Sequence, residues 1–353
     1  FAAGFYLHEK LNFDKPYLGM RVPIAVCFGL TLIVLYFLAG KYYARTGAIL
    51  TVVCYMTIPR VFGHAHVAGT ETILIFLTVL FVYCFVKGLD DWRWSILTGI
   101  TFGLCLATKV NAIFLPFTLI LWAHIFQRGF YANNVFTMLF ISPLVMVLVW
   151  PWLWPDPFGR FMQYLSFFAE HKMVPVMFQH VKYPFMTEHG IQNVPWTYPF
   201  ILAAFTTPTL VLILTVIGLA RTLRNLNSHD VGVLFLLCVI FPLTLAAMPF
   251  TPKYDGVRLF LPIFPFVALL ACIGGEGIAA RIRGFRTSKK RYAPARYFAE
   301  ALALAIFGYG FLAISEVHPH ELSYWNRMFG GFKGAKYAGM ETTYWGDAVN
   351  ETV

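Results

Sequence analysis

The sequence predicts an all-α integral membrane protein, a polytopic bundle of transmembrane helices with external loops. Hydrophobic residues make up 59% of the 353 residues, whereas charged residues make up only 12%. A soluble domain carries roughly 25% charged residues, so this chain could not cover a soluble surface. The apolar residues also gather into runs long enough for helices that cross a bilayer, where no polar cover is needed.

Each candidate span approaches the roughly 20 apolar residues that a membrane-crossing helix needs. One stretch is ambiguous, because Lys109 and Asn111 separate two short runs that could be two helices meeting at a polar apex or one kinked helix. The ten candidates are residues 20–39, 45–59, 68–87, 94–108, 111–127, 134–150, 198–220, 230–249, 258–280 and 297–315. Residues 1–315 are expected to form the bundle. Residues 316–353 are expected to be an external tail that begins a longer extracytoplasmic region.

The net charge of +10 does not indicate a nucleic-acid partner, because the basic residues lie mostly in short loops between apolar runs. Cytoplasmic loops of membrane proteins are enriched in Lys and Arg. If all ten segments cross and residues 1–19 are outside, the short cytoplasmic loops and their flanks hold fourteen basic residues, seven of them in residues 281–296. We therefore favour ten crossings.

The long external loop is residues 151–197, which are rich in aromatic residues and Pro. Within it, residues 158–168 could form an amphipathic helix in the membrane interface. Trp150, Trp152 and Trp154 fit an aromatic belt better than a platform for sugar stacking. The six cysteines all lie in apolar runs without a CxxC pair, so no disulfide framework or zinc site is expected.

Several ionisable residues lie at membrane depth near the external side, where such groups are costly and point to function. A carboxylate there can act as a general base on a hydroxyl, and Lys or Arg can neutralise a phosphate leaving group. Structural roles remain open, since Glu71 could pair with Arg60 and Lys109 could reach the lipid headgroups. The set is Arg60, His64, His66, Glu71, Lys109, Lys253, Asp255 and Arg258. The two histidines are two residues apart and would not share a helix face, so no metal site is expected.

Several stretches follow one another in a familiar order. Residues 21–36 begin with Arg21, residues 47–50 read Gly-Ala-Ile-Leu, and residues 59–71 run from a Pro-led turn to Glu71. An Arg-Leu-Phe-Leu-Pro entry opens residues 258–266, and a polar tail covers residues 318–326, 330–331 and 344–347. Together they resemble the protein O-mannosyltransferase-like superfamily, membrane glycosyltransferases of the GT-C type (family 39).

The resemblance implies a GT-C bundle that takes a polyprenyl-phosphate sugar as its donor, with no certain cofactor and an open metal requirement. In this family an acidic residue, usually Asp, begins a later helix, and Glu71 stands at that place. The family's catalytic Asp lies in the first external loop after a first helix. Since this chain opens at Phe1 without Met, we expect that Asp to precede Phe1, with Asp14 as the candidate inside the chain.

The resulting hypothesis is an inverting hexosyltransferase that moves a sugar from the lipid phosphate to an extracytoplasmic acceptor, either a protein or a glycan or lipid. Its expected place is a bacterial inner membrane. The alternative is a non-catalytic subunit of a larger membrane complex, which would add other membrane subunits to its partners. Glu71 and Asp14 are assigned to catalysis, and phosphate or substrate binding is assigned to Lys109, Arg258, Arg60, Lys253, Asp255 and His66.

Overall fold

The computed structural model describes residues 6, 9–10, 16–126, 131–169, 174–187, 190–226, 230–249, 251–284 and 298–344. The chain divides into two compact units. Unit 1 comprises Phe1–Val34 and Val67–Lys172, and unit 2 comprises Leu35–His66 and Met173–Val353. Helix α2 (Pro16–Gly40) belongs to both, because the division falls within it.

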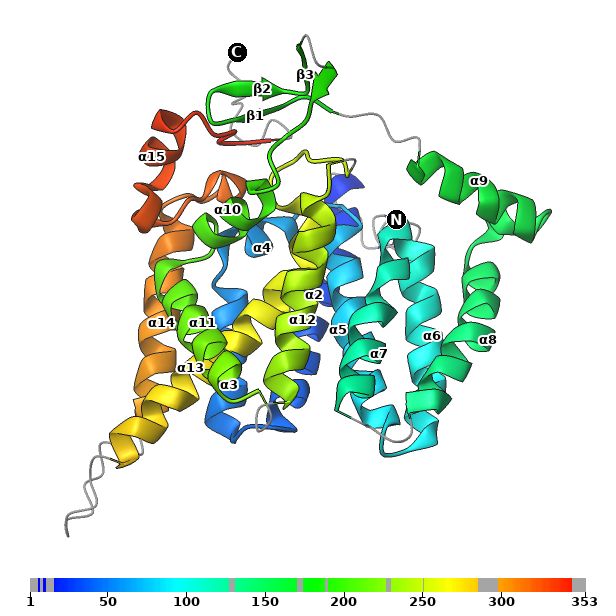
Figure 1. Ribbon diagram of the computed structural model, residues 1–353, viewed down its shortest axis with the longest axis horizontal. Helices are drawn as coiled ribbons and strands as arrows, with labels where there is room; N and C mark the ends of the chain where they lie inside the picture. The colour runs from blue at the N-terminus through cyan, green and yellow to red at the C-terminus, as the bar shows by residue number, and fades with distance from the viewer. Residues whose placement is uncertain are drawn as a thin grey trace. The chain divides into compact units, whose positions relative to one another are not determined.

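Most of the helices of unit 1 run along one common direction in Figure 1, whereas its last helix, Pro157–Ala169, lies across that direction. Pro151 and Pro157 begin its last two helical segments, at positions where a helix needs no backbone N–H. The elements are α5 (Glu71–Gly88), α6 (Trp92–Thr108), η1 (Val110–Phe114), α7 (Leu115–Ile125), α8 (Tyr131–Val149), η2 (Pro151–Leu153) and α9 (Pro157–Ala169).

Small residues bring α6 and α8 together in unit 1. A Cβ added at Gly99 would lie 2.5 Å from the carbonyl oxygen of Thr137, so a larger residue there would push the helices apart. The Ser142 hydroxyl in turn donates to the Gly99 carbonyl at 2.8 Å. The Asn134 amide donates to the Phe85 carbonyl of α5 at 2.9 Å. Small residues and hydrogen bonds between helices are the usual means of helix association in a bilayer, where apolar contacts alone give little preference for protein over lipid.

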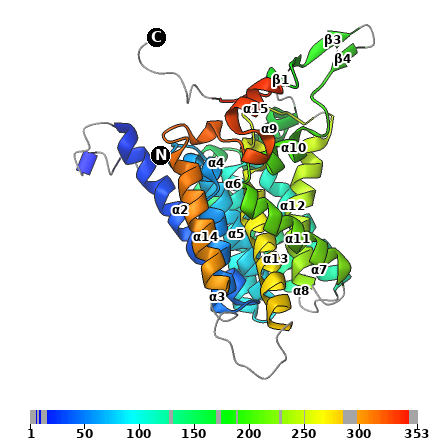
Figure 2. The same ribbon diagram turned by 90° about the vertical axis from the view of Figure 1, so that its left-hand side faces the viewer.

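Unit 2 packs around α13, whose residues 266–273 are all buried. Helices α3, α11, α12 and α14 contact it. The strands and α15 lie together at one end of this unit, and α11 and α13 finish at the other (Figures 1 and 2). The helices are α3 (Arg45–Met56), α4 (Pro59–His64), α10 (Tyr198–Phe205), α11 (Thr209–Arg224), α12 (Asp230–Ala247), η3 (Arg258–Ile263), α13 (Phe264–Gly284), α14 (Phe298–Ser315), η5 (Glu321–Ser323), η6 (Arg327–Phe329) and α15 (Gly331–Tyr337).

The loop 151–197, predicted to be external, contains the amphipathic helix predicted for residues 158–168, which is α9. Its exposed Phe158, Met162 and Phe167 fit a helix that lies in a membrane interface. The rest of the loop holds two antiparallel hairpins that the sequence analysis did not anticipate. Strand β1 (Val176–Phe178) pairs with β2 (Val181–Tyr183), and β3 (Phe185–Thr187) pairs with β4 (Gly190–Gln192).

Four of the described helices are long and apolar enough to cross a membrane: Gly19–Gly40, Glu71–Gly88, Tyr131–Val149 and Arg258–Ile282. Of the other predicted segments, four are shorter apolar helices: Arg45–Met56, Val110–Ile125, Val231–Ala247 and Glu300–Ser315. The ambiguous stretch around Lys109 forms two helices rather than one, because Lys109 is extended (φ −160°, ψ 134°) and ends α6.

The expectation of one uninterrupted helix over residues 198–220 was wrong. Helices α10 and α11 meet at an angle of 118°. Pro208 lacks a backbone N–H and keeps the preceding residue out of the helical region, which explains the break. The carbonyl groups freed by the break are satisfied by Asn326, whose side chain donates to Ala204 at 3.0 Å and to Thr207 at 2.8 Å.

Candidate functional site

In unit 1, the structure joins Glu71 to Lys109. Glu71 is the first residue of α5 and is only 3% exposed, and its Oε1 lies 3.4 Å from the Lys109 Nζ. A carboxylate at a helix N-terminus and a cation at a helix C-terminus are each favoured by the helix dipole. The extended backbone of Lys109 sends the chain out of α6, while its side chain keeps 23% exposure. The pair is therefore fixed in place and still reachable.

In unit 2, a comparable pair stands at the entry to η3. The Arg258 Nη1 lies 2.7 Å from the Asp255 Oδ2, and the two side chains keep 28% and 19% exposure. Asp255 and Gly256 both have positive φ, 53° and 59°. This left-handed turn brings Asp255 back toward Arg258, three residues later in the chain.

Arg60 lies on α4 in the same unit and is buried to 1% exposure. Its Nε donates to the carbonyl of Tyr324 at 3.1 Å, and its guanidinium lies 5.1 Å from the Trp325 ring centroid and 5.9 Å from that of Tyr344. Such stacking on aromatic faces stabilises a desolvated cation. Arg60 thus holds residues 324–344 against α4. Its Nη2 has no hydrogen-bond partner among the described residues.

Glycine is favoured at position 256 because its backbone has a positive φ and packs directly against Arg60. A Cβ at Gly256 would lie 2.8 Å from the Arg60 Nη1 and 2.7 Å from the Tyr344 ring. Tyr344 is itself held by the His64 Nε2, 2.9 Å from its hydroxyl. The 255–256 turn, α4 and the end of the tail therefore form one packed cluster in unit 2.

Glu341 is a member of this cluster that the sequence analysis did not single out. Burial raises the pKa of its carboxyl from the ordinary 4.5 to about 7; the charge of Asp255 raises this pKa further, whereas Arg60 lowers it. Its Oε2 and the Tyr198 hydroxyl are buried with no hydrogen-bond partner in the described part of the chain. Glu341 stands in a polar tail, and only the fold brings it near Arg60, so no sequence pattern marked it.

Of the remaining predicted residues, Lys253 and His66 each contact backbone carbonyl groups. Lys253 is 5% exposed, and its ammonium donates to the carbonyls of Met248 at 2.7 Å and Thr251 at 3.3 Å, just beyond the end of α12. His66 is exposed, and its Nδ1 lies 2.7 Å from the Phe62 carbonyl. Asp14 lies outside the described residues. Within the described ranges, no group of three or more His, Cys, Asp or Glu side chains is placed to hold a metal ion.

The apolar helical bundle is that of a membrane protein with the GT-C fold, which solved structures confirm. The chain is similar to ArnT from Cupriavidus metallidurans in the apo state, with a TM-score of 0.56 and 14% identity. It is equally similar to ArnT from Cupriavidus metallidurans bound to undecaprenyl phosphate, with a TM-score of 0.56 and 15% identity. Each match covers 86% of this chain and 58% of the ArnT chain, so this chain spans little more than half of ArnT's length.

The family model of the dolichyl-phosphate-mannose-protein mannosyltransferases matches residues 10–154. This confirms the resemblance to the O-mannosyltransferase-like superfamily. No curated protein sequence matches the chain significantly. The matched residues include both members of the Glu71–Lys109 pair.

Proposed function

We propose that this protein is a membrane glycosyltransferase that moves a sugar from a polyprenyl-phosphate donor to an extracytoplasmic acceptor. The match to a family named for transfer from dolichyl-phosphate-mannose supports the donor class. The likeness to an ArnT structure bound to undecaprenyl phosphate supports a polyprenyl lipid. In the reaction, the acceptor hydroxyl attacks the anomeric carbon, its proton passes to a base, and the lipid phosphate leaves.

One observation about the side chains carries the proposal. Lys109 and Arg258 are each fixed by a carboxylate, and each keeps about a quarter of its side chain exposed, at 23% and 28%. A cation held in place before the reaction stabilises developing negative charge without having to reorganise. Lys binds a phosphate as a point charge and Arg binds it bidentately. Lys109 in unit 1 and Arg258 in unit 2 are each assigned as a candidate for binding the leaving phosphate.

Glu71 fits a supporting role, since its carboxylate is buried against Lys109 and positions that ammonium. Arg60 fits a structural role better than direct phosphate binding, because it is buried and holds the tail. The catalytic base is assigned to an acidic residue of the first external loop, with Asp14 the candidate in this chain.

The test is transfer of radiolabelled sugar from polyprenyl-phosphate donors by the intact protein in lipid. Lys109→Ala would also leave Glu71 buried without this partner, which costs about 3–5 kcal/mol for a fully buried pair. We therefore compare Lys109→Met with the double variant Glu71→Gln/Lys109→Met, in which the buried charge is gone. Lys87→Met near the other end of α5 is the matched control, and Arg258→Gln is tested alongside.

We expect Lys109→Met, the double variant and Arg258→Gln each to lose transfer by about 10²-fold or more, the size of effect seen when one group that stabilises transition-state charge is removed. Lys87→Met should transfer like the wild type. Equal transfer by all variants would remove Lys109 and Arg258 from the site. A folded intact protein that transfers from no donor would favour the non-catalytic membrane subunit.

A further inference from the structure

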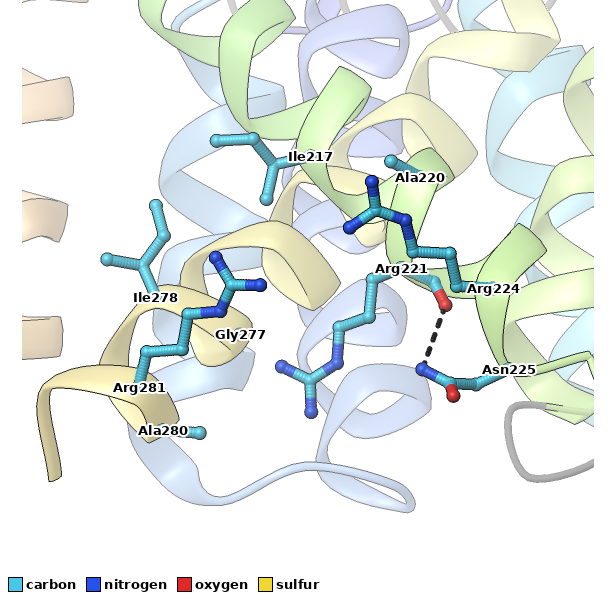
Figure 3. Close-up of a pocket in the computed structure, with 9 residues that line it drawn as sticks. All are labelled: Ile217, Ala220, Arg221, Arg224, Asn225, Gly277, Ile278, Ala280 and Arg281. Carbon is cyan, nitrogen blue, oxygen red and sulfur yellow. Dashed lines mark hydrogen bonds between the residues drawn. The ribbon is translucent and has the colours of Figure 1, made fainter. Parts of the chain in front are cut away.

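A second basic site lies in unit 2, at the end where α11 and α13 finish. It is a hollow of about 560 Å³ between the two helices (Figure 3). Three arginines and Asn225 supply its polar lining, and the rest is small or aliphatic. The lining residues are Ile217, Ala220, Arg221, Arg224, Asn225, Gly277, Ile278, Ala280 and Arg281.

A glycine leaves room for the Arg221 side chain at the hollow. A Cβ at Gly277 would lie 2.5 Å from the Arg221 Nη1 and 3.2 Å from its Cδ, so a methyl group at this position would displace the Arg221 guanidinium. The Asn225 amide reaches back to the Arg221 carbonyl at 3.4 Å (Figure 3). Arg221 is half-buried, whereas Arg224 and Arg281 are exposed.

The hollow concentrates positive charge. No carboxylate lies within ion-pair distance of Arg221, Arg224 or Arg281 among the described residues. Guanidinium groups bind phosphate oxygens in pairs of parallel hydrogen bonds. Basic pockets between transmembrane helices on the cytoplasmic side are known sites for phosphate headgroups of lipids.

The lining of the hollow changes from polar at the helix ends to apolar toward the middle of the helices. Ile217 lies one helical turn before Arg221, and Ile278 lies about one turn before Arg281, so both isoleucines are nearer the middle of their helices. A phosphate held by the arginines would leave the glycerol and the first acyl carbons of a lipid against these isoleucines. A soluble anion would make no use of them.

The hollow is distinct from the site proposed for transfer. Arg258 and Arg281 stand near opposite ends of the membrane-spanning helix Arg258–Ile282, which has 25 residues. At about 1.5 Å per residue its two ends lie on the order of 35 Å apart. A lipid bound at Arg281 therefore cannot be the donor bound at Arg258.

Arginines at helix ends often only set orientation in the membrane, because cytoplasmic loops are enriched in basic residues. That role needs no pocket lined by arginines of two helices and no glycine beneath one of them. Both features are present here. We propose that this pocket binds the phosphate-bearing headgroup of an anionic membrane lipid on the side opposite the transfer site.

The test uses the intact protein purified in neutral detergent and stripped of lipid. Binding of short-chain phosphatidylglycerol, phosphatidylcholine and inorganic phosphate is measured by native mass spectrometry, and the melting temperature is followed in parallel. The variants are Arg221→Gln, Arg224→Gln, Arg281→Gln and Gly277→Ala. Arg45→Gln is the matched control, an exposed arginine at the start of α3 that does not line the hollow.

We expect phosphatidylglycerol to bind and to raise the melting temperature, with each pocket arginine variant weakening binding roughly fivefold, which corresponds to about 1 kcal/mol per basic residue. Gly277→Ala should weaken it without a change of charge, and Arg45→Gln should leave it unchanged. Equal loss in Arg45→Gln and the pocket variants would overturn the pocket in favour of diffuse charge. If inorganic phosphate or phosphatidylcholine bound as tightly as phosphatidylglycerol, the anionic-lipid assignment would be overturned.

Discussion

At the scale of single residues, buried ionisable groups in this protein are controlled by neighbours that are distant in sequence. Arg60 is held by Tyr324, Trp325 and Tyr344, which lie 264 to 284 positions later in the chain. Glu341 belongs to the same cluster, and its raised pKa comes mainly from burial. A group that titrates near neutral pH inside a packed cluster makes the stability of that cluster depend on pH.

The pH dependence follows from the pKa of Glu341. Because this pKa is raised from 4.5 to about 7, the folded state binds more protons than the unfolded state between these values. The contribution of the protonated carboxyl to stability is full below pH 4.5, and it is lost as the pH rises through 7. We expect the melting temperature in detergent to fall across this window in the wild type.

The control is Glu341→Gln, which keeps the shape of the side chain and removes its titration. In this variant the melting temperature should no longer fall between pH 4.5 and 7 through titration of residue 341. The variant should also be more stable than the wild type near pH 8. A slope that is the same in both proteins would assign the pH dependence to another group.

The sequence indicated which residue types to examine at this scale but not their partners. Arg60, Glu71, Lys109 and Arg258 attract notice because charges at membrane depth are expensive. Asp255, three residues before Arg258, was already a candidate, and the structure shows the ion pair. Glu341 and Tyr198 could not be recognised, because their importance arises only when the tail and α10 pack beside Arg60.

At the scale of helices, apolar runs predicted where elements would form, and individual residues decided where they break. Lys109 was identified as a polar apex, and the structure ends α6 there. Pro208 was available as a cue for the break between α10 and α11, yet the run from 198 to 220 contains no charged residue, and this hid the break. The support from Asn326, more than a hundred residues later, could not be inferred from the local sequence.

The contact between α11 and α13 depends on two glycines. A Cβ at Gly274 would lie 2.1 Å from the Leu214 carbonyl oxygen, and one at Gly218 would lie 1.9 Å from that of Leu270. In both cases the obstacle is backbone, so the helices themselves would have to separate. Close approach through small residues is a main source of helix association in membranes.

We therefore expect Gly274→Ala to lower the free energy of unfolding by about 1–3 kcal/mol, the usual cost of overpacking. The matched control is Gly308→Ala on α14, where an added Cβ meets nothing within 4 Å. That substitution should raise stability by about 0.5–1 kcal/mol, because alanine is the better helix former. Thermal unfolding of both variants in one detergent gives the comparison, and equal effects would contradict the packing account.

At the scale of the whole molecule, composition alone established the membrane class, because a chain with 12% charged residues cannot cover a soluble surface. The fold comparison confirms a GT-C bundle. Orientation rests on a different kind of evidence, the distribution of Lys and Arg among loops. It decides which compartment the Lys109 and Arg258 pairs face, and so whether the acceptor is extracytoplasmic.

Orientation can be measured with two cysteine reporters in unit 2. Tyr337 on α15 is 88% exposed, and Leu226 just after α11 is 47% exposed, at the two opposite ends of the unit. Of the native cysteines only Cys27 is not buried, so the reporters are placed in a Cys27→Ala background to prevent labelling at that position. A membrane-impermeant maleimide should label Tyr337→Cys in intact cells and Leu226→Cys only after permeabilisation, since the basic loops keep the α11 end inside. The reverse pattern would place Arg258 on the cytoplasmic side and would require an acceptor there. The expected pattern places the proposed transfer site on the external face and the arginine pocket on the cytoplasmic face.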